Sequence, residues 1–263
     1  MSQSPNETVL FEVQEGIGYI TFNRPQARNA FTLGMYERFE QILQQVRSDA
    51  SIHVLVLMGA GEKAFAAGTD ISEFKAFSRP EDALNYESRV DQVLGLLERL
   101  QIPTMAAIAG VCTGGGAAIA ACCDIRIGAA NARFGVPIAR SLGNCLSMAN
   151  YARLTALLGP ARVADLIFTA RLIEANEARA AGLLSEVLPD YASLKDRAAE
   201  LARTISAHAP LTLRVTKEAL RRIREKITPE EDPSLILMCY MSRDFREGMD
   251  AFLNKRTPEW KGM

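Results

Sequence analysis

Two glycine-containing turns are the segments of this sequence best suited to chemistry. They are residues 66–70 (AAGTD) and residues 114–116 (GGG), and each lies where a strand-like run gives way to a helix-like pattern. The first N–H groups of a helix lack intrahelical acceptors and carry partial positive charge, and glycine lets a ligand approach the backbone closely. Two such N–H groups that converge on one point would form an oxyanion hole. Either turn taken alone is equally well explained by tight packing.

Three apolar runs must position these turns. Residues 53–58, 103–109 and 124–128 predict strands that are buried on both faces. Helical patterns occupy residues 81–100 and the segment from the glycine triplet to residue 121. The alternation of strand and helix predicts right-handed parallel crossovers and an α/β fold.

The two ends of the chain differ in pattern. Residues 9–13 and 19–23 predict a β-hairpin, and a loop then leads to a helix from about residue 33. The second half is mainly helical, with segments near 148–158, 162–168, 174–181 and 193–207 and about three more up to Phe252. We place a boundary near residues 200–210, which divides the chain into a core of residues 1–205 and a C-terminal helical region of residues 206–263.

Composition excludes several classes of function. The chain has 263 residues, a net charge of −1 and no block of like charges, so we expect no charge-driven nucleic-acid partner. Five cysteines without a CxxC pair indicate neither a disulfide framework nor a structural zinc site, and they favour a reducing cytoplasm. The N-terminal segment lacks the pattern of a signal peptide. The longest apolar stretch, residues 102–121, is interrupted by Pro103 and by glycines, so we expect no membrane span.

Short motifs in a fixed order extend along nearly the whole chain. They are residues 23–30 (NRPQARNA), 63–71 (KAFAAGTDI), 102–103 (IP), Gly110, 114–116 (GGG), 123–124 (CD), 132–135 (ARFG), 180–185 (AAGLLS), Phe252 and 255–256 (KR). Together they resemble the crotonase, or enoyl-CoA hydratase/isomerase, superfamily. The resemblance implies an α/β, crotonase-like spiral of repeated ββα units with a C-terminal helical region for oligomerisation. It also implies homotrimers or hexamers that are dimers of trimers.

The resemblance assigns roles in binding an acyl-CoA thioester. The N–H groups of Thr69 and Gly115 would hold the thioester oxygen and stabilise an enolate. CoA itself would be part of the substrate, and no metal or further cofactor is implied. The CoA-binding positions implied in this way are Ala27 and Arg28 in the nucleotide loop, Ala64, Ala66 and Ala67 beside the pantetheine arm, and Phe252 and Lys255, which can reach the CoA of a neighbouring subunit.

The sequence departs from the family pattern at both hydratase glutamates. These glutamates lie two residues beyond the glycine triplet and one residue beyond the F-G-x-P turn, where this chain has Ala118 and Ile138. Adding water to a double bond needs a positioned base and acid. We therefore expect that the chain does not follow the standard hydratase mechanism with those groups.

Other polar residues near the first turn are candidates to replace these glutamates. Glu87 lies between Tyr86 and Arg89 on the following helix, and solvation on a helix surface is the simpler interpretation of all three. Asp70 and Glu73 fit a capping box, which explains both without a catalytic role.

Three further candidates surround the second lost glutamate: Arg140, Asn144 and Cys145. Asn144 is also a plausible helix N-cap, and nothing near Cys145 in the sequence would clearly lower the pKa of its thiol. The two histidines, His53 and His208, fall at a strand start and in a late loop, so a Ser-His-Asp triad is not expected.

Three hypotheses remain. The first is an enzyme that acts on a CoA thioester as a hydratase-like lyase, an isomerase or a decarboxylase; decarboxylation has weight because an enolate-stabilising site needs fewer acid–base groups for it. The second is a non-catalytic CoA-binding homologue, because both glutamates are absent. The third is a dinucleotide-dependent oxidoreductase, which rests only on the glycine triplet and lacks the G-x-G-x-x-G spacing. We favour the enzyme.

Overall fold

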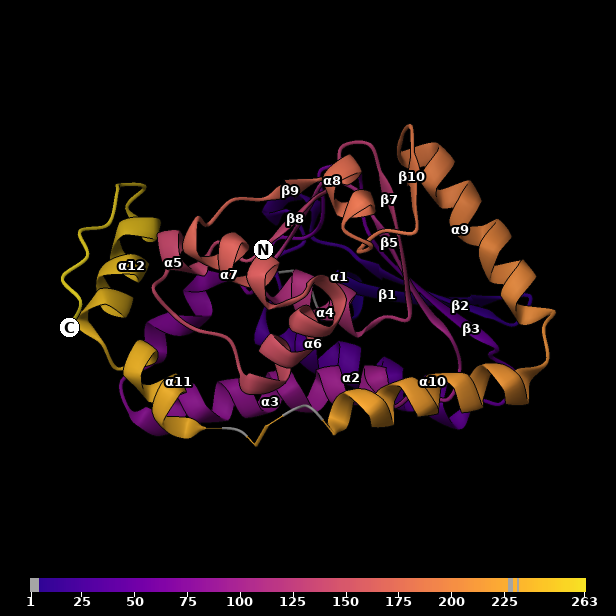
Figure 1. Cartoon of the computed structure of the whole chain (residues 1–263), viewed down its shortest axis with the longest axis horizontal. Helices are drawn as coiled ribbons and strands as arrows, with labels where there is room; N and C mark the ends of the chain where they lie inside the picture. The colour runs from indigo at the N-terminus through magenta and orange to yellow at the C-terminus, as the bar shows by residue number, and fades with distance from the viewer. Residues whose placement is uncertain (1–4, 227–228, 231) are drawn as a thin grey trace.

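Two sheets of unequal size form the centre of the molecule (Figure 1). The structure is a computed structural model that describes residues 5–226, 229–230 and 232–263. In the larger sheet five neighbouring strands run parallel, and the first strand joins their edge as the antiparallel arm of a hairpin. In spatial order the strands are β1 (Val9–Gln14), β2 (Ile17–Phe22), β3 (Val54–Gly59), β5 (Thr104–Ile108), β7 (Ile125–Ala129) and β10 (Glu186–Leu188). The predicted hairpin and the three predicted buried strands are therefore confirmed.

A smaller sheet carries short strands that follow the long ones along the chain. Its strands are β4 (Ala64–Ala66), β6 (Val111–Thr113), β8 (Arg133–Gly135) and β9 (Ile173–Glu174), of which the first three run parallel and β9 runs antiparallel. Along the chain, β3 and β4 precede α3 (Pro80–Glu98), β5 and β6 precede α4 (Gly115–Cys122), and β7 and β8 precede α5 (Ile138–Ser141). The fold is thus an α/β spiral of repeated ββα units, as expected.

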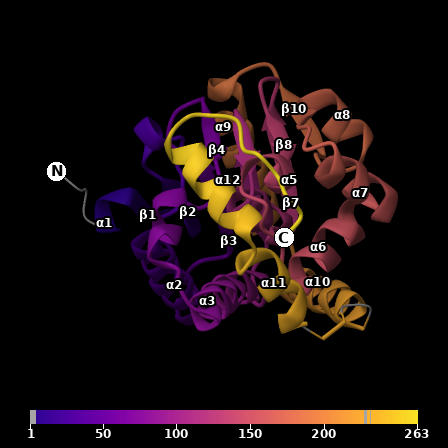
Figure 2. The same ribbon diagram turned by 90° about the vertical axis from the view of Figure 1, so that its left-hand side faces the viewer.

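Helices surround the sheets and make up most of the described C-terminal region. The remaining helices are α1 (Pro5–Thr8), α2 (Leu33–Ser48), α6 (Met148–Leu158), α7 (Pro160–Phe168), α8 (Ala175–Ala180), α9 (Tyr191–Ser206), α10 (Pro210–Glu225), α11 (Pro233–Tyr240) and α12 (Arg243–Leu253), with 3-10 helices η1 (Pro25–Ala27) and η2 (Ile71–Ala76). The expected boundary at residues 205–206 coincides with the end of α9. Figures 1 and 2 show α11 and α12 at the end of the molecule opposite the junction of α9 and α10.

Strand β3 shows why its sequence is apolar without alternation. Val54 and Val56 pack on the face of the large sheet that α9 covers, whereas Leu55 and Leu57 pack on the face that α2 and α3 cover. Successive side chains of a strand point to opposite faces. Because helices cover both faces, every position of the strand must be apolar.

In the part of the chain that the structure describes, no helix combines the length and the hydropathy that crossing a bilayer requires.

Candidate active site

One large cavity gathers most of the residues that the sequence singled out. It has a volume of about 1010 Å³ and lies among the glycine turns, α3, the segment between α5 and α6, and the C-terminal helices. Ala64 and Ala66 are buried within β4, behind the wall rather than on it. The candidates on the wall itself are Ala27, Arg28, Ala67, Thr69, Glu87, Gly115, Ala118, Ile138, Arg140, Asn144, Cys145, Phe252 and Lys255.

Each glycine of the triplet has its own structural reason. Gly114 has φ 52° and ψ −122°, which residues with a Cβ rarely adopt. A Cβ on Gly115 would lie 2.6 Å from the Tyr36 hydroxyl oxygen, and one on Gly116 would lie 2.2 Å from the Ala66 carbonyl oxygen. The chain therefore turns tightly into α4, whose first residue is Gly115. At this position the N–H group has no acceptor within the helix.

A single β-bridge orients the N–H group of Thr69. Phe31 N–H donates to the Gly68 carbonyl at 2.8 Å, and Asp70 N–H donates to the Phe31 carbonyl at 2.7 Å. These bonds occupy the side of the segment that faces Phe31. In such a bridge the N–H of the middle residue points to the other side, away from Phe31, and Thr69 is one of the residues that line the cavity.

The two glycine turns lie in contact with each other. A Cβ built on Gly68 would be 3.8 Å from the Gly115 nitrogen, and one built on Gly114 would be 3.4 Å from the Gly68 Cα. Both turns line the same cavity. The start of α4 adds the partial positive charge of a helix N-terminus. Two N–H groups so placed can stabilise an oxygen atom that gains negative charge.

Two phenol hydroxyl groups contact the Thr69 side chain of the first turn. Thr69 Oγ1 lies 3.0 Å from the Tyr36 hydroxyl and 2.6 Å from the Tyr86 hydroxyl. Burial raises the pKa of Tyr36 to about 12, although its hydrogen bond to Thr69 opposes the rise. Burial likewise raises the pKa of Tyr86 well above its ordinary value. Both phenols therefore remain neutral at physiological pH and hold Thr69 without adding charge.

A buried carboxylate, Glu87, forms another part of the wall. Glu87 is 6% exposed, and its Oε1 accepts a hydrogen bond of 2.5 Å from the Tyr240 hydroxyl of α11. Asn144 Nδ2 donates to the same hydroxyl oxygen at 3.3 Å. Burial and the charge of Glu87 raise the pKa of Tyr240 well above its ordinary value, so this phenol keeps the proton that it donates. The Asn144 amide therefore donates to the Tyr240 hydroxyl, and this hydroxyl in turn donates to the Glu87 carboxylate.

This geometry corrects the surface interpretation of residues 86–89. It is wrong for Glu87, which is buried, and for Tyr86, whose hydroxyl contacts Thr69. It holds for Arg89, whose side chain is half exposed and pairs with Glu40 at 3.3 Å on the neighbouring helix α2. Arg89 lies only two positions after Glu87, which places the two side chains on different faces of the helix, and the sequence pattern alone did not distinguish the solvated position from the cavity position.

Asp70 also borders the cavity, but its carboxylate is committed to the fold. It caps η2 by accepting from Ser72 N–H at 3.2 Å, and it pairs with Arg24 at 3.1 Å. Burial alone would raise the pKa of Asp70, but the hydrogen bonds from Ser72 and Arg24 outweigh it and lower the pKa. The expected capping box is only half formed, because the Glu73 carboxylate accepts from the Leu33 N–H instead of closing the box.

Asn29 fixes the loop of Ala27 and Arg28 against the first turn. It is fully buried, and its Nδ2 donates to the Ala64 carbonyl at 2.7 Å. Arg28 and Asn29 both have positive φ, at 52° and 55°, so the chain bends sharply here. The Arg28 carbonyl then accepts from the Ala67 N–H at 3.0 Å. These contacts hold the loop beside the turn that carries Thr69.

The segment between α5 and α6 corrects a second prediction. Asn144 is not the N-cap of α6, because Ser147 holds that position and accepts from the Asn150 N–H. The Asn144 side chain is turned toward Tyr240 instead. Arg140 is exposed where it borders the cavity.

Cys145 does not have the environment of a nucleophile. Its thiol donates to the Leu235 carbonyl at 3.6 Å. Interaction with the Cys239 thiol and burial raise the pKa of Cys145. Cys145 therefore remains a thiol, and only thiolates are strong nucleophiles.

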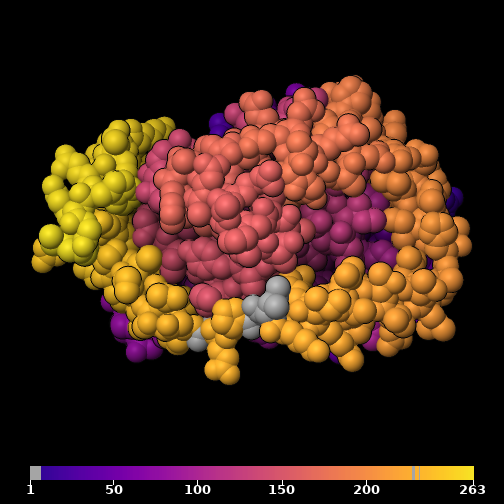
Figure 3. Space-filling model, in the orientation of Figure 1, coloured from indigo at the N-terminus to yellow at the C-terminus, as the bar shows by residue number. Residues whose placement is uncertain are grey.

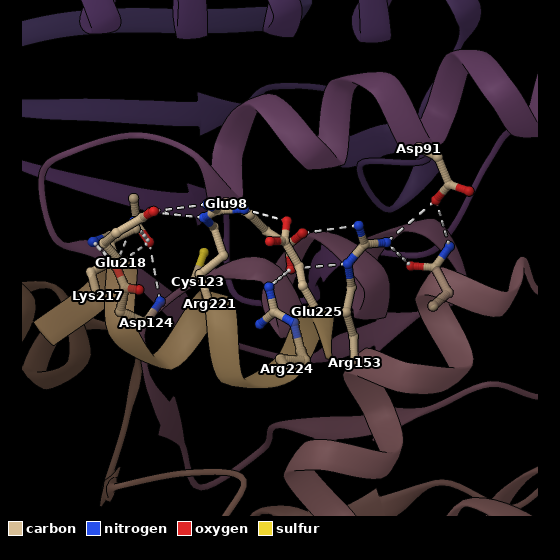
Figure 4. Close-up of polar contacts among 12 residues, drawn as sticks. Asp91, Glu98, Cys123, Asp124, Arg153, Lys217, Glu218, Arg221, Arg224 and Glu225 are labelled. Atoms are coloured by element: carbon tan, nitrogen blue, oxygen red, sulfur yellow. Dashed lines mark hydrogen bonds and ion pairs between the residues drawn. The ribbon is translucent and has the colours of Figure 1, made fainter. Parts of the chain in front are cut away.

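A buried arginine holds Asn150, another residue of the wall, in place. Arg153 is 6% exposed and donates to Asn150 Oδ1 at 2.8 Å. The same guanidinium pairs with Glu98 at 2.9 Å and with Asp91 at 3.3 Å (Figure 4). Arg224 of α10 also pairs with Glu98, at 2.7 Å. The cavity wall on α6 is thereby tied to α3 and to the C-terminal region.

Tyr36 and Tyr240 are site residues that the sequence analysis missed. Tyr36 lies in the apolar stripe of α2, where a tyrosine resembles any other core residue. A hydroxyl within such a stripe is a signal, since a buried phenol needs a hydrogen-bond partner. Tyr240 contacts Glu87 across 153 positions of sequence, and no local pattern indicates that contact.

A second hollow continues the cavity toward basic residues. It has a volume of about 460 Å³ and shares Arg28, Val111 and Arg133 with the large cavity. Lys63 adds a third cation, and the carboxylates of Glu62 and Glu174 also line this hollow. An extended ligand that occupies both spaces would place one end at the oxyanion site and the other among these cations.

Known proteins with similar sequences and structures indicate the family. The family model described as Enoyl-CoA hydratase/isomerase matches residues 12–263. The short-chain-enoyl-CoA hydratase of Clostridium acetobutylicum is 34% identical over 257 residues, which cover 95% of this chain and 96% of that protein. A solved methylmalonyl-CoA decarboxylase in complex with 2-nitronate-propionyl-CoA has a TM-score of 0.88 at 29% identity, covering 97% of this chain and 99% of that one. A solved monofunctional enoyl CoA isomerase from M. smegmatis has a TM-score of 0.70 at 28% identity, covering 83% of this chain and 94% of that one. The chain therefore belongs to the enoyl-CoA hydratase/isomerase family of acyl-CoA enzymes.

Proposed function

We propose that the protein is an enoyl-CoA isomerase that moves a double bond by proton transfer, with Glu87 as the proton carrier. The observation that supports this most is the buried Glu87 carboxylate on the cavity wall. The two positions of the family's hydratase glutamates carry Ala118 and Ile138, which line the same cavity without an acid–base group. Among the described lining residues, Asp70 is the other carboxylate, and Arg24 already pairs with it.

In this proposal one carboxylate serves as base and then as acid. Glu87 removes a proton from the carbon next to the thioester carbonyl of a 3-enoyl-CoA, and the C–H electrons move toward the carbonyl oxygen. The negative charge is stabilised by the N–H groups of Thr69 and Gly115, each worth about 3–4 kcal/mol in comparable sites. Glu87 then returns the proton to carbon 4, which yields the 2-enoyl-CoA. The reaction consumes no water, so it does not need the second acid–base group that hydration requires.

Tyr240 prepares Glu87 for the first step. Its hydroxyl donates to the carboxylate, and a hydrogen bond to the ionised form favours that form. Because the pKa of Tyr240 is raised, the phenol stays a donor throughout. The CoA arm in this proposal passes Ala67 and Arg28 and places its phosphates near Lys63 and Arg133 in the second hollow.

Decarboxylation of a carboxyacyl-CoA is the second candidate. The exposed Arg140 guanidinium at the cavity is a group to which a substrate carboxylate could bind. Loss of carbon dioxide leaves the same enolate at the same oxyanion site. The structural likeness to a methylmalonyl-CoA decarboxylase adds support.

The proposal extends to assembly and compartment: a homotrimer or a hexamer in the cytoplasm. Helix α10 has no buried residue, and four of its apolar side chains are at least 63% exposed. They are Leu211, Val215, Leu220 and Ile223. Figure 3 shows the helix on the surface of the isolated chain. Such a face is suited to contact with another subunit, and light scattering coupled to gel filtration measures the assembly.

The test compares three substrates and one matched pair of variants. Purified protein is offered 3-hexenoyl-CoA, crotonyl-CoA and methylmalonyl-CoA, and the products are separated by chromatography. We expect 2-hexenoyl-CoA from the first and slow or no hydration of the second. Turnover of only the third would replace isomerisation by decarboxylation. Acyl-CoA binding by calorimetry without turnover of any would favour the non-catalytic homologue.

Glu87→Gln is the decisive variant, because it keeps the shape of the side chain and removes the base. We expect kcat to fall by about 100-fold or more, in line with loss of a general base, with little change in CoA affinity. Glu81→Gln makes the same change on the same helix at an exposed position and should retain activity. Equal activity of the two variants would contradict the role of Glu87.

A further inference from the structure

We propose that the Thr69 hydroxyl is a third hydrogen-bond donor for the thioester oxygen, in addition to the N–H groups of Thr69 and Gly115. The inference rests on the proposed function, because it assigns a further donor to the same oxyanion site. Thr69 lines the large cavity. Its Oγ1 atom lies 3.3 Å from the position of a Cβ built on Gly115. The hydroxyl is therefore located where the two glycine turns meet, next to the residues that carry both proposed N–H donors.

Two phenols determine where the Thr69 proton can go. Thr69 Oγ1 lies 3.0 Å from the Tyr36 hydroxyl oxygen and 2.6 Å from the Tyr86 hydroxyl oxygen, and both distances are those of O–H···O hydrogen bonds. A phenol is a stronger acid than an aliphatic alcohol, and its oxygen is a weaker acceptor because the ring withdraws electron density. A hydroxyl oxygen can accept two hydrogen bonds. We therefore assign both phenols as donors to Thr69 Oγ1.

The burial of Tyr36 supports this direction of donation. Its side chain is 1% exposed, and an unpaired buried donor costs stability, so its single proton must be donated to a neighbouring oxygen. Tyr86 is close enough for each phenol to influence the pKa of the other, but for each of them Thr69 Oγ1 is the better acceptor. Thr69 Oγ1 then accepts twice, and its own proton remains available to a ligand in the cavity.

A threonine can present its N–H and its O–H to one ligand oxygen. Only two carbon atoms separate the backbone nitrogen from Oγ1, so an oxygen at hydrogen-bond distance from one can also reach the other. The two hydrogen bonds that Thr69 Oγ1 accepts polarise its O–H group and make it a stronger donor. In the enolate the thioester oxygen carries negative charge, and a hydrogen bond to a charged acceptor is stronger than one to a neutral carbonyl. The hydroxyl therefore stabilises the enolate more than the bound thioester, as catalysis requires.

The experiment compares Thr69→Val with Thr69→Ser. Valine keeps the branched shape and the main-chain N–H and removes the hydroxyl, whereas serine keeps the hydroxyl. We expect Thr69→Val to lower kcat for isomerisation of 3-hexenoyl-CoA by about 100-fold with little change in KM, in line with the loss of one oxyanion donor. Thr69→Ser should retain most of the wild-type rate. An equal loss in both variants, or no loss in Thr69→Val, would overturn the proposal.

A spectroscopic measurement reports on the same donor without turnover. The absorption of 2,4-hexadienoyl-CoA moves to longer wavelength when its carbonyl oxygen is polarised. We expect a smaller red shift on binding to Thr69→Val than on binding to wild type or Thr69→Ser, and equal red shifts in all three would overturn the proposal. If the wild type turns over no enoyl-CoA, the proposed isomerase fails, and the red shifts still decide the role of the hydroxyl.

Tyr36 provides the control for a purely structural effect, because Thr69→Val also leaves the buried Tyr36 hydroxyl without this partner. Tyr36→Phe removes the same contact but keeps the Thr69 hydroxyl, so it should lower kcat much less than Thr69→Val does. The double variant Tyr36→Phe/Thr69→Val has no unpaired phenol at this position and should keep the low rate and the small red shift of Thr69→Val. Recovery of wild-type values in the double variant, or an equal loss in Tyr36→Phe, would assign the effect to packing and overturn the proposal.

Discussion

Replacing Tyr240 by phenylalanine tests whether Glu87 acts as an ionised base that one phenol holds in place. The substitution removes the hydroxyl that donates to Glu87 at 2.5 Å and accepts from Asn144 at 3.3 Å. The ring itself is 1% exposed and packs against Phe245 and Phe74, with ring centroids 4.8 Å and 6.3 Å away. Phenylalanine keeps this packing, so the change isolates the hydrogen bond.

The expected effect is a shift of the pH profile. A hydrogen bond to a charged group contributes about 1.5–3 kcal/mol, and a factor of ten in ionisation corresponds to about 1.4 kcal/mol. Because the bond favours the ionised carboxylate, its loss makes ionisation harder. The acid limb of kcat/KM for the isomerisation should therefore move to higher pH by about 1–2 units. The rate at high pH, where the carboxylate ionises anyway, should fall much less.

The assay follows formation of 2-hexenoyl-CoA across about pH 5 to pH 9, the range that brackets such a limb. Tyr86→Phe is the matched control, because its hydroxyl lies 2.6 Å from Thr69 Oγ1 rather than on Glu87. We expect this control to change the rate without moving the acid limb. An unmoved limb in Tyr240→Phe, or an equal shift in both variants, would refute the reasoning.

Three further predictions concern the oxyanion site and the loops that hold it. Gly115→Ala should lower kcat by about 100-fold, because its Cβ would lie 2.6 Å from the Tyr36 hydroxyl; adding Tyr36→Phe should recover part of the rate, and no recovery would contradict the clash. Asn29→Ala should lower the free energy of unfolding in urea by about 2–4 kcal/mol, because its buried amide bonds are lost, whereas the exposed Asn85→Ala should change it by less than about 0.5 kcal/mol. The folded-state pKa of Asp70 is lowered, so its contribution to stability is present above its unfolded pKa and is lost as pH falls; the stability difference between wild type and Asp70→Asn should shrink in acid, and a constant difference would count against that ion pair.

The fold was largely predictable because its strands are buried on both faces. An apolar run such as residues 53–58 can be neither an amphipathic helix nor a half-exposed strand, so its pattern is informative without any tertiary contact. The capping of α6 was less predictable. Asn144 and Ser147 are both good N-caps, and the contact of Asn144 with Tyr240 excludes it from that role. The local N-cap preference of a residue contains no information about a contact with a helix that begins about ninety residues later.

The candidate site also has a part that the sequence predicts and a part that it does not. The glycine turns are visible in the sequence, because a positive φ at Gly114 and a close approach at Gly116 both exclude a side chain. The proposed acid–base residue is not visible, because a glutamate on a helix is normally exposed to solvent. Glu87 is buried where α11 packs on α3 and where Tyr240 donates to it. The sequence could name Glu87 as a candidate but could not place it.

The difference between main-chain and side-chain groups of the site helps to explain how one fold supports different reactions. The proposed N–H donors of the oxyanion site belong to the main chain, so substitution of side chains would leave them in place as long as the turns keep their shape. The acid–base group is a side chain and can be supplied by another element. In this chain α4 and α5 carry Ala118 and Ile138 at the cavity, and neither has an acid–base group. Helix α3 carries the carboxylate of Glu87, and Tyr240 of α11 donates a hydrogen bond to it. Under the proposed function, the reaction is set by which carbon atom of the bound acyl group lies nearest that carboxylate, and the C-terminal region then takes part in the chemistry through Tyr240.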